Sequence, residues 1–170
     1  MSSFVALLRA VNVGGTGKLS MLDLRALCEA ANFRSVRTYI ASGNVLFESG
    51  KSAQEVKQVL ERQLHRHAGK PVGVAVRTAA ELAQVVADNP FPDAPGDRVA
   101  AIFLDASPPP DLIDRVTGRA EDEEIRLGQR EIYVLYGHGM GRSKLRIPGA
   151  ESGTARNMNT IRKLAEMAAE

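Results

Sequence analysis

The sequence lacks most of the features that stabilise or specialise a protein through covalent or metal chemistry. A single cysteine, Cys28, rules out an intrachain disulfide. The histidines are His65, His67 and His138, and the first two lie two residues apart on a predicted helix, where they face different directions. Tryptophan is absent, and no apolar run approaches the roughly 18 residues of a membrane span. We therefore predict a cytoplasmic protein without metal, cofactor or membrane partner.

Charge of one sign is also scarce. The formal net charge of +2 is too small to indicate nucleic-acid binding by itself. Its distribution is uneven, because residues 142–163 hold six basic side chains and one acid. The acidic run 121–124 lies just upstream, and we interpret it as a solvated helix end and turn.

The composition is otherwise that of a globular protein with its own core. The chain has 170 residues, of which 44% are hydrophobic and 25% charged. A chain of this length buries about 70% of its surface on folding, so it needs no disulfide or metal to stabilise it.

The first half alternates strand and helix signals. Apolar runs predict strands at 4–11, 36–41, 44–48 and 72–76. Two helical stripes lie between them, the first opening at Ser20 with Asp23 and the second at Ser52 with Glu55, both in capping-box spacing. Asn32 is expected to end the first helix in a left-handed conformation. The order strand, helix, strand, strand, helix, strand predicts a ferredoxin-like (βαββαβ) unit with an antiparallel sheet over residues 1–78.

The second half begins in the same order but is less regular. Thr78 with Glu81 predicts a linker helix, which a proline-rich connection follows, so residues 79–97 form the linker. Strands are predicted at 99–104, 124–127 and 131–136, with a helix around 112–116 and a final helix that ends the chain. Residues 98–170 are thus predicted to form a second, degenerate ferredoxin-like half, and the fold class is α+β.

Familiar catalytic and phosphate motifs fail on inspection. Gly17-Lys18 is followed by Leu19 instead of the Ser or Thr that a phosphate-binding loop requires, and the glycine-rich loop 137–141 does not lead into a predicted helix. Cys28 lies on the buried stripe of a helix and is expected to be a core residue. Ser143 and Lys144 could pair as nucleophile and base, but neighbouring loop residues rarely face one another.

Several blocks of the chain form a specific combination: 7–15, Met21 with Leu24, 38–40, 42–44, 89–91, 141–145, Arg156-Asn157 and Asn159-Thr160. Together they resemble a bacterial family, domain of unknown function 1697. The resemblance covers nearly the whole chain and implies two ferredoxin-like halves without an established activity, so no catalytic residue is carried over. The chain departs from the family pattern at Ala10, Asn32 and Met158 and in a short stretch between Leu145 and Thr154.

The remaining polar residues are suited to holding an anion. Those in the first half gather at a strand exit and a hairpin tip, and those in the second lie in the basic segment and around the start of the last helix. We predict as ligand-binding residues Arg9, Asn12, Lys18, Arg37, Tyr39, Ser42, Asn44, Arg142, Ser143, Lys144, Arg156, Asn157, Asn159 and Thr160. The alternative is structural: Asn157 only caps the last helix, Arg156 pairs with an acid, and 42–44 only forms a turn.

These residues support three hypotheses. The first is a protein that binds a phosphate-bearing ligand, nucleic acid or a nucleotide, at a surface between the two halves. The second is an enzyme acting on a small phosphorylated or carboxylated metabolite, with Tyr39 or Lys144 as the proton carrier. Its substrate would be held by four basic residues: Arg9, Arg142, Lys144 and Arg156. The third is a structural or assembly protein that uses exposed sheet edges.

Overall fold

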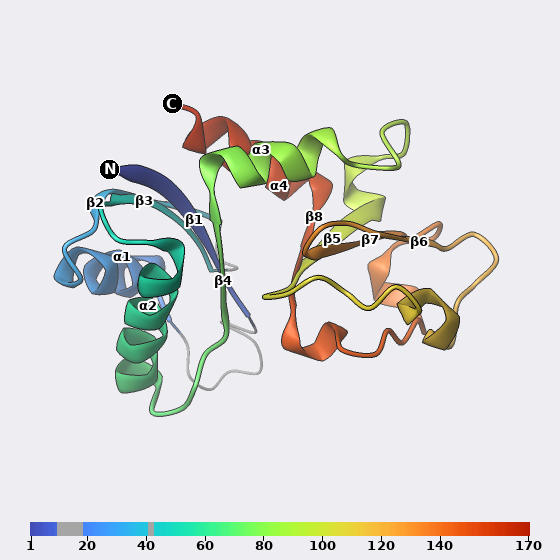
Figure 1. Cartoon of the computed structure of the whole chain (residues 1–170), viewed down its shortest axis with the longest axis horizontal. Coiled ribbons are helices and arrows are strands. Elements are labelled where there is room, and N and C mark those ends of the chain that lie inside the picture. Colours follow the sequence, from blue (N-terminus) through green and yellow to red (C-terminus); the bar gives the residue numbers. More distant parts are fainter. Residues whose placement is uncertain (10–18, 41–42) are drawn as a thin grey trace. The chain divides into compact units, whose positions relative to one another are not determined.

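The computed structural model describes residues 1–9, 19–40 and 43–170. Its contacts group the chain into two units, of which the first comprises Met1–Leu82 with Leu164–Glu170 and the second Ala83–Lys163. The protein is α+β, because each unit contains a four-stranded antiparallel sheet and helices accompany them (Figure 1). The boundaries that the sequence suggests, after residues 78 and 97, stay predictions.

The first unit contains a four-stranded sheet with two helices on one of its faces (Figure 1). Its strands are arranged in the order β2-β3-β1-β4, and all neighbours are antiparallel. The elements follow the chain as β1 (Ser2–Leu8), α1 (Met21–Ala30), β2 (Arg34–Tyr39), β3 (Asn44–Ser49), α2 (Ala53–Ala68) and β4 (Val74–Thr78).

The helix starts of this unit agree with the predicted caps. The Ser20 hydroxyl accepts a hydrogen bond from the Asp23 amide at 3.0 Å. Ser52 and Glu55 form a complete capping box, with each side chain bonded to the other's backbone amide. Asn32 has φ 66°, so the chain leaves α1 in the predicted left-handed conformation. Each helix therefore begins where a local hydrogen bond satisfies its free amides.

The core of the first unit lies between the sheet and the two helices. Phe47 in β3 stacks on Phe33 with ring centroids 4.3 Å apart and lies 5.9 Å from Phe4. Leu24 of α1 and Leu60 of α2 are fully buried in the same cluster. Cys28 is also fully buried there, which agrees with its predicted place in the core.

Burial of Cys28 couples stability to alkaline pH. Burial, and then the charge of Glu29, raise the pKa of its thiol to about 12. An unfolded chain returns the thiol to a pKa of about 8.5, so the unfolded state loses this proton first as pH rises. The thiol's contribution to the free energy of unfolding is therefore complete below about pH 8.5 and is lost progressively towards pH 12.

We expect this loss to amount to about 1–2 kcal/mol between pH 8 and pH 10. Urea unfolding of the wild type and of Cys28→Ala across this range measures it. Other alkaline titrations are common to both proteins, so the stability difference between them isolates the thiol and should shrink as pH rises. A difference that stays constant with pH would contradict the burial of the thiol.

The second unit repeats the strand order of the first with fewer helices. Its sheet has the order β6-β7-β5-β8, again antiparallel throughout. The bounds are β5 (Val99–Phe103), β6 (Glu124–Leu127), β7 (Glu131–Leu135) and β8 (Thr154–Asn157), with short 3-10 turns η1 (Gly96–Arg98), η2 (Leu112–Arg115), η3 (Met140–Arg142) and η4 (Ala150–Ser152). The helices α3 (Ala79–Ala87) and α4 (Met158–Ala168) each cross from one unit to the other along the chain.

Two expectations for the second unit are wrong. The helix predicted around 112–116 is only the 3-10 turn η2, because prolines precede it and Gly118 follows it closely, which leaves no room for further turns. No strand is predicted between residue 136 and the final helix, but this segment contains β8, which completes the sheet by pairing with β5. Capping at Thr78 is as predicted: its amide and hydroxyl exchange hydrogen bonds with Glu81 at the start of α3.

Candidate functional site

Three described residues of the predicted polar cluster, Arg9, Tyr39 and Asn44, lie at one end of the sheet of the first unit. Leu7 and Tyr39 are both cross-strand partners of Asn44, so the exit of β1 and the β2–β3 hairpin are neighbours. Asn44 is fully buried, and its amide donates to the Tyr39 carbonyl at 3.1 Å. Arg9 follows β1, with its backbone amide bonded to Gly73 and its guanidinium packed against the same glycine. Asn44 therefore holds the hairpin together instead of facing a ligand.

Arg37 is engaged within its own unit. Its guanidinium bonds to the carboxylate of Glu170 at 2.9 Å and to the carbonyl of Met167 at 2.8 Å, near the end of α4. An anion would have to compete with this carboxylate for Arg37. The predicted residues Asn12, Lys18 and Ser42 lie outside the residues that the structure describes.

The predicted residues around the last helix have mainly structural contacts. The Asn157 side chain accepts a hydrogen bond from the Thr160 amide at 2.9 Å and so caps α4, as the sequence suggests. Asn159 packs so closely on Gly96 that a Cβ there would lie 2.0 Å from its side-chain oxygen. Arg156 is half-buried in β8 and donates to the Ala155 carbonyl, and burial lowers its pKa to about 10, so it remains protonated at neutral pH.

The three consecutive residues Arg142, Ser143 and Lys144 line one cavity of about 380 Å³ in the second unit. Two loops form its walls, one leading into β6 and the other following β7. We call this cavity the Ser143 pocket, and its lining residues are Gly118, Ala120, Asp122, Glu123, His138, Gly139, Arg142, Ser143 and Lys144.

Backbone contacts hold the two loops of the Ser143 pocket together. Thr117 and Arg146 form an isolated antiparallel bridge, with hydrogen bonds of 3.0 and 2.8 Å. Gly118 follows with φ +72°, and a Cβ there would lie 2.1 Å from the Lys144 carbonyl oxygen. Val116 and Leu145 pack against the hydrophobic core of the second unit. The two walls are therefore fixed relative to each other by short contacts and by a shared core.

A buried carboxylate faces the serine of this pocket. Glu123 is only 4% exposed, and one of its oxygens accepts the Ala120 amide at 2.8 Å. Its other oxygen, Oε2, accepts the Ser143 hydroxyl. Burial, and then the charge of Glu123, raise the pKa of the neighbouring Tyr136 above its ordinary value, so Tyr136 keeps its proton at neutral pH.

A second polar pair occupies the pocket rim. The Nδ1 atom of His138 contacts the carboxylate of Asp122, while most of the imidazole remains exposed. Asp122 itself packs on the backbone of Gly137, where a Cβ would lie 2.2 Å from its Oδ2 atom. Carboxylate contact at Nδ1 leaves the opposite ring nitrogen, Nε2, available to a bound molecule.

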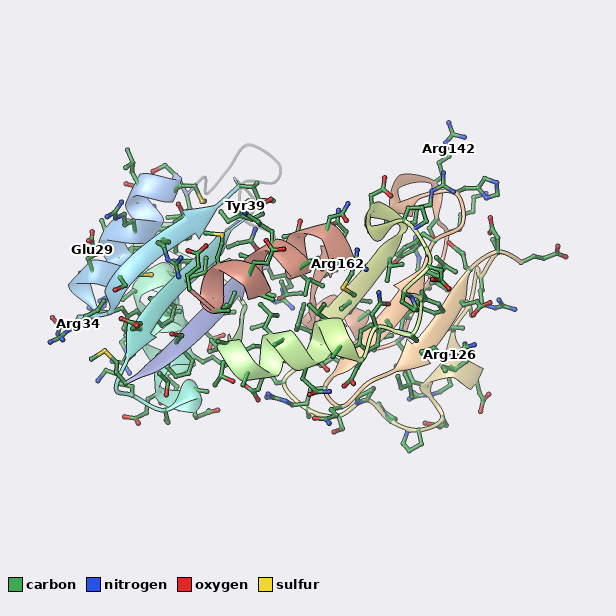
Figure 2. The ribbon with its side chains drawn as sticks, turned by 90° about the horizontal axis from the view of Figure 1, so that it is seen from above. Glu29, Arg34, Tyr39, Arg126, Arg142 and Arg162 are labelled. Carbon is green, nitrogen blue, oxygen red and sulfur yellow. The ribbon has the colours of Figure 1, made fainter. Side chains whose placement is uncertain are left out.

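The two cations of the pocket are accessible. Arg142 and Lys144 are both exposed, and Figure 2 shows Arg142 extending outward from the ribbon. Neither of them forms an ion pair with any residue in 1–9, 19–40 or 43–170. Their charges are therefore available to an anionic group that binds at the cavity.

The basic side of the pocket was predictable from the sequence, but its acidic side was not. Asp122 and Glu123 belong to the acidic run expected to be solvated, and His138 was rejected only as a metal ligand. Burial of Glu123 depends on a loop that returns from a distant part of the chain, and nothing in the local pattern signals it.

Among the described residues, no three His, Cys, Asp or Glu side chains gather as metal ligands.

The fold and pocket together define an α+β protein with a small cavity that is lined in part by charged side chains. The chain belongs to the family described as "Protein of unknown function (DUF1697)", whose model matches residues 1–133. This confirms the family resemblance seen in the sequence. No match was found among curated proteins.

A solved structure supports the fold over nearly the whole length of the chain. It is the conserved bacterial protein SP0830 from Streptococcus pneumoniae, which is 22% identical, with a TM-score of 0.82 over 98% of each chain. At this identity the likeness shows the fold alone.

No helix of the described residues is both long and apolar enough to cross a membrane.

Proposed function

We propose that the protein binds a phosphate-bearing ligand of nucleotide size in the Ser143 pocket, with Arg142 and Lys144 contacting the phosphate. The observation that carries this proposal is a cavity lined by two exposed cations, neither of which is ion-paired with a described residue. The third predicted residue, Ser143, lies in the same wall.

The size of the pocket favours a small ligand over a nucleic-acid strand. Its volume of about 380 Å³ falls at the lower end of small-molecule sites. Two charge-assisted contacts contribute about 1.5–3 kcal/mol each, or about 3–6 kcal/mol together. These contacts correspond to dissociation constants from the millimolar range to some tens of micromolar.

The carboxylates of the pocket favour a ligand that also carries hydroxyl or amino groups. Asp122 and Glu123 would repel a bare dianion but can accept hydrogen bonds from such donors. A nucleotide offers both parts, since its phosphate suits the cations and its ribose or base supplies donors. We therefore infer a nucleotide or sugar phosphate in preference to inorganic phosphate.

Titration calorimetry and thermal shift with AMP, ribose 5-phosphate, inorganic phosphate and a short single-stranded RNA test this proposal. We expect AMP to bind, and at 100 times its dissociation constant to stabilise the protein by about 2.7 kcal/mol. Inorganic phosphate should bind more weakly. RNA binding should be weak and lost between about 50 and 200 mM salt.

Charge-matched variants assign the binding to the pocket. Arg142→Ala with Lys144→Ala should weaken AMP binding at least about 100-fold, because both charge-assisted contacts are lost. The control, Arg62→Ala with Lys70→Ala, removes the same charge from exposed positions of the first unit and should leave binding unchanged. Equal binding by the two double variants, or no binding by the wild type, would contradict the proposal.

The shared strand order supports a finer description of the fold. Both sheets have the sequence of strands that a ferredoxin-like unit requires, and the first unit carries two helices on one face. We propose that both units follow this plan and that short 3-10 turns replace the helices of the second.

We also propose a cytoplasmic location, which the lone buried cysteine supports.

A further inference from the structure

We propose that Ser143 is a nucleophile that accepts a phosphoryl group from a phosphate monoester, with Glu123 as its general base. This inference deepens the proposed function, and it rests on that function for the position of the phosphate. It assigns the Ser143 pocket a reaction, phosphoryl transfer followed by hydrolysis, that binding alone does not imply.

The hydrogen bonds at Ser143 orient it for this reaction. Its hydroxyl donates to Glu123 Oε2 and accepts the Leu145 amide at 3.1 Å. The proton therefore already points at a carboxylate. A nucleophilic serine needs such an adjacent base, since a free hydroxyl is a weak nucleophile at neutral pH.

Glu123 is held in position for proton transfer. Its Oε1 atom accepts the Ala120 amide at 2.8 Å, and Arg119 donates to its backbone carbonyl. The side chain is 4% exposed, so it has little freedom to turn away from Ser143. Glu123 and Ser143 both line the cavity, so a substrate bound there can reach the Ser143 hydroxyl.

The flanking cations supply the charge stabilisation that phosphoryl transfer needs. Arg142 and Lys144 adjoin Ser143 in the chain and line the same cavity. Negative charge on the oxygens of a transferring phosphoryl group is stabilised by fixed cations of this kind. Lys144 is adjacent to Ser143 in the chain, but the Ser143 hydroxyl donates to the Glu123 carboxylate, so we assign the base to Glu123 and a phosphate contact to Lys144.

The reaction balances without a further reactant except water. Ser143 Oγ forms a bond to phosphorus as the bond from phosphorus to the leaving oxygen breaks. The hydroxyl proton passes to Glu123 and then to the leaving alkoxide, which departs as an alcohol. Water then attacks the phosphoserine, gives its proton to Glu123 and releases inorganic phosphate, and that proton returns to Ser143 Oγ.

Trapping of the phosphoserine tests the proposal directly. The full chain is incubated with p-nitrophenyl phosphate or acetyl phosphate, quenched in acid, digested and analysed by peptide mass spectrometry. We expect the peptide containing Ser143 to carry one phosphoryl group, and p-nitrophenol to be released. A wild-type protein that carries no phosphoryl group at Ser143 with either compound overturns the proposal, whatever the variants do.

Three variants separate the roles of the residues. Ser143→Ala should abolish both labelling and turnover, and Glu123→Gln, which keeps the shape and an acceptor for Ala120, should slow labelling about 10²- to 10⁴-fold. Ser152→Ala is the matched control, because Ser152 is an exposed serine of the same unit whose hydroxyl donates to the Gly149 carbonyl, and it should behave as wild type. Unchanged labelling in Glu123→Gln would refute the assignment of Glu123 as the general base.

The outcomes distinguish this inference from the proposed function. If AMP binds through Arg142 and Lys144 but Ser143 is never phosphorylated, the reaction is refuted and the binding function stands. If Ser143 is phosphorylated equally in Arg142→Ala with Lys144→Ala, the reaction stands and the assigned phosphate contacts are refuted. Absence of both binding and labelling refutes both.

Discussion

Replacing Gly118 by alanine is expected to destabilise the second unit by about 2–5 kcal/mol and to abolish ligand binding in the Ser143 pocket. Gly118 has φ +72°, a conformation that costs a residue with a Cβ roughly 1–2 kcal/mol. The new Cβ would also lie 2.1 Å from the Lys144 carbonyl oxygen, and relieving such overpacking costs about 1–3 kcal/mol more. The clash is with backbone, so the loop that carries Ser143 has to move. Calorimetric unfolding and AMP titration of Gly118→Ala measure both effects.

A glycine in the same conformation provides the control. Gly149 has φ +85°, and nothing lies within 4 Å of the position of its Cβ. Gly149→Ala should therefore cost only the conformational part, about 1–2 kcal/mol, and leave the pocket intact. If the two variants lose the same stability and both bind AMP, the close approach of the two loops at Gly118 is not present in solution.

Removing one leucine from the face of α1 that packs on the sheet is expected to cost the first unit about 2–5 kcal/mol of its free energy of unfolding. Leu24 is 0% exposed and contacts the cluster beneath α1, so Leu24→Ala leaves a cavity that rigid neighbours cannot fill. Urea unfolding followed by far-UV circular dichroism gives the change in midpoint and in free energy.

The same helix contains a leucine whose replacement should leave the free energy of unfolding nearly unchanged. Leu22 lies two residues earlier and is 79% exposed, so Leu22→Ala makes the same chemical change without creating a cavity. Its effect should stay within about 0.5 kcal/mol. A comparable loss in both variants would mean that α1 is rotated about its axis relative to the structure described.

The fold was predictable where neighbouring residues determine it. The caps at Ser20, Ser52 and Thr78 and the left-handed Asn32 were all expected from spacing, because each involves residues no more than about four apart. The strand β8 was not predicted, because Thr154–Asn157 is a short segment. It is stabilised by pairing with β5, which lies some fifty residues earlier in the chain.

The candidate site was predictable only in part for the same reason. Arg142, Ser143 and Lys144 stand out as polar residues in a glycine-rich basic segment, and the structure places all three in one pocket wall. The structure assigns Arg37, Asn44 and Asn157 to contacts within the fold, which shows that residue type alone does not separate a ligand contact from a structural one.

The amino-acid sequence by itself determined the family, the α+β class, most helix starts and the basic segment that contains the pocket residues. Only the tertiary structure decided that Glu123 is buried against Ser143, a partner twenty residues away. The physical reason is that capping bonds and side-chain periodicity act within a few residues, whereas the Ser143–Glu123 contact exists only after the Thr117–Arg146 bridge and the core have brought two distant loops together.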